Sequence, residues 1–219
     1  MDQVMEKRNQ GSDKVRIAVL VSGGGTNLQA ILDAEKDGII ASGEVTLVIS
    51  DRPGAYALQR AERFGVPTLE IDRKARGGHP AFEEKLLSAL EENRTELIVL
   101  AGFLSILSKD FTDRYAGRIL NVHPSLIPSF CGAGYYGLRV HEAALERGVK
   151  VTGATVHFVN EIPDGGEIIA QKAVEILPGD TPEILQRRVM EQAEWIILPR
   201  SIETVCRKML VESRSPRTV

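Results

Sequence analysis

Short apolar runs alternate along this sequence with segments that carry apolar residues at helical spacing, and this alternation limits the folds open to the chain. Val15–Val21 is a run of strand length that is apolar except at Arg16, and residues 27–37 show the spacing of an amphipathic helix. The same alternation predicts strands at 45–50, 68–71, 97–101 and 119–122, and helices at 55–64 and 80–93. Such an order favours an α/β fold with a mostly parallel central sheet flanked by helices.

The carboxyl-terminal third has a different pattern. Residues 154–159 and 167–176 alternate like the strands of a hairpin around an Asp-Gly-Gly turn at 164–166, and a long helix is expected from about Thr181, with Pro182 in its first turn. No segment has the composition of a linker between domains. We therefore expect one domain over residues 15–208, a flexible extension at 1–14 and a tail at 209–219.

Composition excludes several classes of protein. The 219 residues are 43% hydrophobic, enough for one substantial core, and the net charge of −3 argues against a nucleic-acid partner or an anionic membrane surface. The longest apolar stretches are far too short to span a bilayer. The two cysteines, Cys131 and Cys206, suit neither a metal site nor a disulfide scaffold, so we expect a cytoplasmic protein without a metal.

A glycine-rich stretch at 22–27 (Ser-Gly-Gly-Gly-Thr-Asn) joins the first strand to the first helix. Glycines allow a tight turn there, and the free amides at the helix start can bind a phosphate. The stretch lacks the lysine of a Walker loop, and Leu28 breaks the dinucleotide-binding pattern. The turn could equally serve only to close the strand onto the helix, so the local sequence leaves both interpretations open.

A polar pair ends the fifth expected strand. Strand alternation points Asn121 and His123 to the same side, at the carboxyl end of a parallel strand, where open α/β sheets bind ligands. An amide beside an imidazole suits the stabilisation of negative charge on an oxygen during acyl transfer. A histidine satisfied by loop carbonyls is the ordinary structural alternative.

Other titratable residues are weaker candidates. Asp164 is the carboxylate we pair with the polar cluster, although Asp-Gly is also a common turn sequence. His157 faces either the same pocket or solvent. His79 and His141 lie near expected helix starts, where surface or capping roles are favoured, and Cys131 lacks an activating base that would make it a nucleophile.

Four segments together resemble the glycinamide-ribonucleotide formyltransferase family: residues 21–29, 100–103, 120–126 and 155–166. The resemblance extends from residue 15 to about residue 202. The Asn-x-His-Pro-Ser element alone is typical of the wider formyltransferase superfamily, and its combination with the glycine loop and the chain length is specific to this branch. The resemblance implies a single-domain, Rossmann-like formyltransferase fold with a carboxyl-terminal hairpin and long helix.

The resemblance also implies an activity, the transfer of a formyl group from 10-formyltetrahydrofolate to the amine of glycinamide ribonucleotide in de novo purine biosynthesis. In the implied mechanism the amine attacks directly, Asn121 and His123 stabilise the oxyanion, and Asp164 relays a proton. Both substrates are small molecules, and no metal is needed. Whether the protein forms a homodimer is left open. The implied contacts with the nucleotide are Gly25, Thr26, Asn27 and Glu194, the last matched by counting back from Pro199. The implied contacts with the folate pterin are Phe103, Leu104, Ile106 and Leu107.

The chain departs from the family pattern at three places. A longer loop at 129–137 replaces a short one, and its glycines and aromatics predict a mobile lid. Ser105 stands where the family often has arginine, and an arginine for the folate's glutamate tail is replaced near His79. The candidates to substitute for that arginine are Arg73, Lys74 and Arg76. An extra residue before Glu194 leaves the phosphate contact of that helix on either Met190 or Glu191.

Three rival functions follow from the same motifs. A methionyl-tRNA formyltransferase should carry a further carboxyl-terminal domain, and a formyltetrahydrofolate hydrolase a further amino-terminal one. A non-catalytic nucleotide-binding module would need only the glycine loop. We expect none of these, because little sequence lies outside the formyltransferase segment and the polar cluster accompanies the loop.

Overall fold

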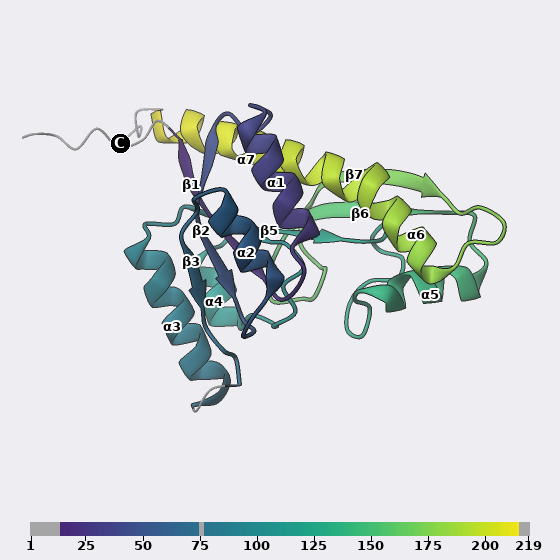
Figure 1. Ribbon diagram of the computed structural model, residues 1–219, viewed down its shortest axis with the longest axis horizontal. Helices are drawn as coiled ribbons and strands as arrows, with labels where there is room; N and C mark the ends of the chain where they lie inside the picture. Colours follow the sequence, from purple (N-terminus) through teal and green to yellow (C-terminus); the bar gives the residue numbers. More distant parts are fainter. Residues whose placement is uncertain (1–13, 75–76, 215–219) are drawn as a thin grey trace, which may run out of the picture.

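A seven-stranded sheet forms the centre of the protein, whose computed structural model describes residues 14–74 and 77–214 (Figure 1). The strands are β1 (Val15–Val21), β2 (Gly43–Ser50), β3 (Thr68–Glu70), β4 (Leu97–Leu100), β5 (Ile119–His123), β6 (Val151–Phe158) and β7 (Ile168–Glu175). Their order in the sheet is β3-β2-β1-β4-β5-β6-β7. Strands β1 to β5 are parallel, whereas β6 runs antiparallel to β5 and to β7.

Helices cover both faces of this sheet. They are α1 (Thr26–Lys36), α2 (Tyr56–Arg63), α3 (Gly78–Glu92), α4 (Lys109–Arg114), α5 (Leu138–Arg147), α6 (Pro182–Val189) and α7 (Trp195–Arg214), with a π-helical turn at Met190–Glu194 between the last two. Helices α1 and α7 lie beside each other on one face (Figure 1), and α3 and α4 pack on the other. In the part of the chain that the structure describes, no helix combines the length and the apolar character needed to cross a membrane.

The packing of the first strand shows why its sequence is apolar at every position but Arg16. Ile17 and Val19 face the core shared with α1 and α7, whereas Ala18 and Leu20 face the core shared with α3 and α4. All four side chains are fully buried. Because successive strand residues point to opposite faces, a strand is apolar at every position where helices cover it on both sides. Polar side chains are therefore tolerated only where such strands end.

The predicted fold class is confirmed: the fold is α/β, with a mostly parallel sheet, a carboxyl-terminal antiparallel hairpin and a long terminal helical region. Helix α4 has no counterpart among the expected elements, and for α5 only a helix start near His141 was expected. The terminal helical region is divided by the π-helical turn at Met190–Glu194. Helix α7 also continues through Arg214, into the expected tail, because Met209 and Leu210 pack against the core. The expected extension lies, up to residue 13, outside the described residues.

The candidate site depends on a change of direction in the strand order. After β1 the chain adds β2 and β3 on one side, and then β4 and β5 on the other. The loops after β1 and β4 therefore meet at the carboxyl edge of the sheet, where α/β proteins bind ligands. A hydrogen bond joins them: the Leu104 amide donates to Ser22 Oγ at 2.8 Å.

The close pairing of β6 with β7 requires glycine at position 153. A Cβ there would lie 2.1 Å from the Lys172 carbonyl oxygen. We expect Gly153→Ala to lower the free energy of unfolding by roughly 1–3 kcal/mol, the usual cost of overpacking. Urea unfolding would measure it, with Gly23→Ala as the control because no atom lies within 4 Å of its added Cβ. Equal unfolding midpoints for the two variants would contradict this account.

Candidate active site

The register between β5 and β6 places Asn121 directly opposite His157. His157 Nδ1 lies 2.8 Å from the Phe158 carbonyl oxygen, which only accepts hydrogen bonds, so Nδ1 carries the proton. His157 Nε2 then accepts from Asn121 Nδ2 at 3.2 Å. His157 is thus a buried partner that orients the Asn121 amide.

One carboxylate joins the polar groups of this region. Asp164 Oδ2 accepts from the Gly132 amide at 2.8 Å and lies 3.4 Å from His123 Nδ1. Asp164 Oδ1 lies 3.4 Å from Asn121 Nδ2 and 3.5 Å from His157 Nε2. Asp164 has a φ of 56°, an unusual backbone conformation that aspartate tolerates better than most residues. The hairpin turn thus directs this carboxylate to the end of β5.

Burial and charge act in opposite directions on this pair. Burial lowers the pKa of His123, which is 4% exposed, while the Asp164 carboxylate and the Phe130 carbonyl act to raise it. For Asp164, burial alone would raise the pKa, but the neighbouring His157 and His123 rings and the hydrogen bond from the Gly132 amide bring it below its usual value. Asp164 is therefore ionised at neutral pH and is the fixed negative charge of the site.

Apolar side chains of the loop after β4 adjoin the polar cluster. Phe103, Ile106 and Leu107, three of the four residues expected to contact the pterin, line the same cavity as Asn121 and Asp164. Leu104 lies outside that lining, with 41% of its surface exposed. The arrangement can hold a flat apolar molecule beside an amide, an imidazole and a carboxylate.

The glycine loop lies at the start of α1. Gly25 precedes the helix with a φ of 73°, and a Cβ there would lie 2.6 Å from Ala57 Cβ, so this position favours glycine. Thr26 is exposed, and the first-turn amides of a helix can bind an anion. Asn27 is buried, and its Nδ2 donates to Glu194 Oε2 at 2.6 Å.

Glu194 is a buried carboxyl with Asn27 as its hydrogen-bonding side chain. Burial raises its pKa to about 7, although the hydrogen bond from Asn27 acts to lower it. A π-helical turn, a feature often found at functional sites, ends at Glu194. Of the two candidates for the phosphate contact, Met190 reaches the loop, with its Sδ 3.7 Å from Thr26 Oγ1, while Glu191 is exposed.

A second buried carboxylate, Asp51, was missing from the sequence analysis. It follows β2, is fully buried, and accepts from Ser105 Oγ at 2.6 Å. Arg73 Nη1 lies 3.8 Å from the same Asp51 oxygen and 3.4 Å from Ser105 Oγ. Of the three basic candidates, Arg73 is thus the one in contact with Ser105. Lys74 donates its amide to Asp72, and Arg76 lies outside the described residues. The position of Asp51 at a strand end was the available signal.

The remaining histidines and Cys131 do not join the cluster. His79 is exposed, with Nε2 2.7 Å from the Ile106 carbonyl oxygen. The expectation for His141 was wrong: α5 turns it into the interior, where it is fully buried and, among the described residues, neither ring nitrogen has a hydrogen-bond partner. Burial lowers the pKa of His141 to about 4. Burial and Asp164 raise the pKa of the Cys131 thiol, which disfavours it as a nucleophile.

Comparison with known proteins establishes the family. A family model described as formyl transferase matches residues 15–202. The phosphoribosylglycinamide formyltransferase of Haemophilus influenzae is 43% identical over 86% of this chain and 85% of its own. The chain belongs to the phosphoribosylglycinamide formyltransferase family. The glycinamide ribonucleotide transformylase 1 of Symbiobacterium toebii has a similar structure, with a TM-score of 0.83, 44% identity and 90% of both chains covered.

Some members of this family are parts of longer proteins. The trifunctional purine biosynthetic protein adenosine-3 of Gallus gallus is 46% identical over 89% of this chain, which spans only 19% of that protein. The family resemblance inferred from the sequence is thus confirmed. In the part of the chain that the structure describes, no group of three or more histidine, cysteine, aspartate or glutamate side chains could hold a metal ion.

The raised pKa of Glu194 predicts a pH-dependent stability. A carboxyl whose pKa is near 4.5 unfolded and about 7 folded binds more protons when folded, so its stability contribution is greatest below pH 4.5 and is lost as the pH rises toward 7. We expect Glu194→Gln to raise the free energy of unfolding at pH 8 by on the order of 2 kcal/mol relative to the wild type, and by little at pH 4.5. Urea unfolding at both pH values measures this, and the same difference at both would contradict it.

Proposed function

We propose that this chain transfers the formyl group of 10-formyltetrahydrofolate to the amine of glycinamide ribonucleotide, a step of purine biosynthesis. The observation that carries the proposal is the Asp164 carboxylate, which lies within 3.4 Å of polar atoms of both Asn121 and His123 at the carboxyl end of β5. Membership of the family supplies the substrate class. The polar cluster supplies groups for acyl transfer.

The proposed reaction is a direct attack of the amine on the formyl carbon. A new carbon–nitrogen bond forms, and the carbonyl oxygen takes up the negative charge. The Asn121 amide donates a hydrogen bond to that oxygen, and the positive charge of protonated His123 stabilises it from nearby. The amine then loses a proton through Asp164, the bond from the formyl carbon to the folate nitrogen breaks, and that nitrogen receives the proton.

The two substrates would occupy adjoining loops. Gly25, Thr26 and Asn27 would hold the phosphate and ribose of the nucleotide at the positive end of the α1 dipole. Glu194, which contacts Asn27, would bind the amine. The folate pterin would lie against the wall formed by Phe103, Leu104, Ile106 and Leu107. The homodimer and the cytoplasmic location stay predictions.

Incubation with 10-formyltetrahydrofolate tests the proposal directly. We expect its absorbance to change to that of tetrahydrofolate only when glycinamide ribonucleotide is also present. Conversion without the nucleotide would instead establish a hydrolase. Nucleotide binding without conversion in either mixture would favour the non-catalytic binding module.

Removal of the amide at position 121 should slow the reaction without unfolding the protein. Loss of one oxyanion donor typically lowers kcat by about 100- to 1,000-fold. We therefore expect this loss for Asn121→Ala, with little change in the dissociation constant of the nucleotide, because the glycine loop is untouched. The matched control is Gln59→Ala, which removes an exposed amide on α2. A kcat for Asn121→Ala within threefold of the control would contradict the assigned role.

A further inference from the structure

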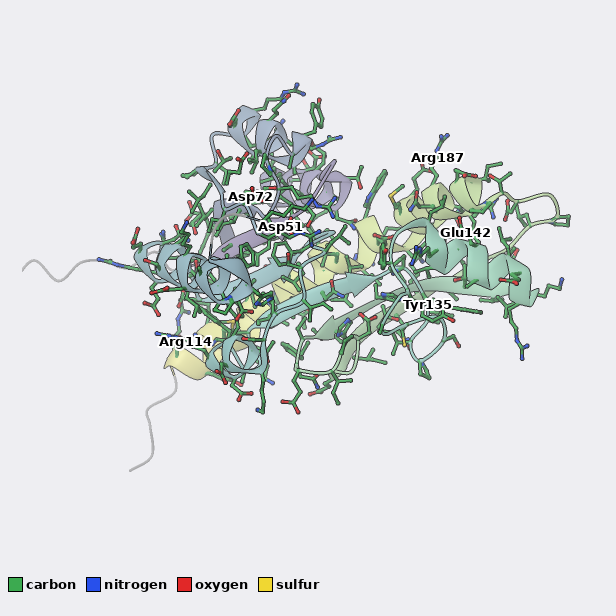
Figure 2. All side chains as sticks on the ribbon, turned by 90° about the horizontal axis from the view of Figure 1, so that it is seen from below. Asp51, Asp72, Arg114, Tyr135, Glu142 and Arg187 are labelled. Atoms are coloured by element: carbon green, nitrogen blue, oxygen red, sulfur yellow. The ribbon has the colours of Figure 1, made fainter. Side chains whose placement is uncertain are left out.

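The loop at 129–137 touches both members of the His123–Asp164 pair through its backbone. The Phe130 carbonyl oxygen lies 2.9 Å from His123 Nε2, and the Gly132 amide donates to Asp164 Oδ2 at 2.8 Å. Figure 2 labels Tyr135 on this loop, near the helix that carries Glu142 and well apart from Asp51 and Asp72. A segment longer than the family pattern thus supplies two polar contacts to the candidate site.

The first contact distinguishes the two nitrogens of His123. A backbone carbonyl only accepts hydrogen bonds, so Nε2 must carry a proton to satisfy the 2.9 Å contact. On the other side of the ring, Nδ1 lies 3.4 Å from Asp164 Oδ2, beyond the usual range of a short hydrogen bond. The shorter contact therefore decides which nitrogen keeps its proton when the imidazole is neutral.

The second contact, from the Gly132 amide, holds the Asp164 carboxylate that faces His123. Asp164 Oδ2 faces both the Gly132 amide and His123 Nδ1. When His123 is protonated, Nε2–H points to the Phe130 carbonyl and Nδ1–H points to the carboxylate, so both N–H groups have acceptors. When His123 releases a proton, it comes from Nδ1, because Nε2–H is retained by the loop.

We propose that the Phe130 carbonyl and the Gly132 amide position the His123–Asp164 pair, so that Nδ1 is the nitrogen of His123 that exchanges a proton. Gly132 is then a positioning residue, since it acts through Asp164. The use of this proton in catalysis rests on the proposed function, whereas the tautomer of His123 does not.

The backbone conformation of the loop offers a matched pair of variants. Gly132 has a φ of 86° and Gly134 a φ of 91°, and a Cβ at either would meet no atom within 4 Å. Substitution with proline therefore brings similar backbone strain at both positions. Only at position 132 does it also remove the amide hydrogen that Asp164 accepts.

Nitrogen-15 NMR of the histidine rings in the full chain tests this assignment. The His123 signals are identified by their loss in His123→Asn. Above the pKa of His123 we expect the wild type to show a protonated Nε2 and an unprotonated Nδ1. Gly132→Pro should lose this preference, while Gly134→Pro should retain it, with circular dichroism confirming that both variants are folded.

A wild-type spectrum with Nδ1 protonated in the neutral form would overturn the proposal, whatever the variants do. Preservation of the Nε2–H tautomer in folded Gly132→Pro, or equal loss in Gly134→Pro, would overturn the role of Gly132. If Gly132→Pro does not fold, an ester in place of the backbone amide at position 132 removes the same N–H, with the same change at position 134 as the control and the same criteria. If the Nε2–H tautomer is found but the chain has no transferase activity, the positioning role stands and only the proposed function is refuted.

Discussion

The burial of the central sheet on both faces is the constraint on which the rest of the molecule depends. Strands β1 and β4 contain only buried apolar side chains, apart from the half-buried Arg16 in β1, because helices cover them from both sides. Polar groups are consequently confined to the segments just beyond the strands, and parallel strands bring those segments to one edge. Ser22, Asp51 and Asn121 are on that edge for the same reason, although they lie far apart in the sequence.

Much of this arrangement could be predicted from the sequence, because it is encoded locally. The buried strands are apolar runs, and β1 has the bounds that its residues predict. Alternation within β5 places Asn121 and His123 on one side, and they lie there in the structure. The likeness to a known family strengthened the choice of Asp164, which the local sequence left open, since an Asp-Gly turn has no local sign that its carboxylate faces a site 43 residues away.

The parts that could not be predicted depend on contacts between distant segments. The direction of His157 is fixed by its pairing with Asn121 across the antiparallel strands. Burial of His141 follows from the packing of α5, a helix whose bounds the sequence left undefined. The π-helical turn at Met190–Glu194 was not predicted from the local sequence; it ends at Glu194, which accepts the hydrogen bond from Asn27.

The hydrogen bond from the Leu104 amide to Ser22 Oγ has a consequence for the two substrates. Ser22 begins the loop assigned to the nucleotide, and Leu104 belongs to the wall assigned to the folate. A ligand that shifts one of these loops alters the anchor of the other, so the two binding events share a coupling free energy. Thermodynamic reciprocity then fixes its form: each substrate changes the affinity of the other by the same factor, whichever binds first.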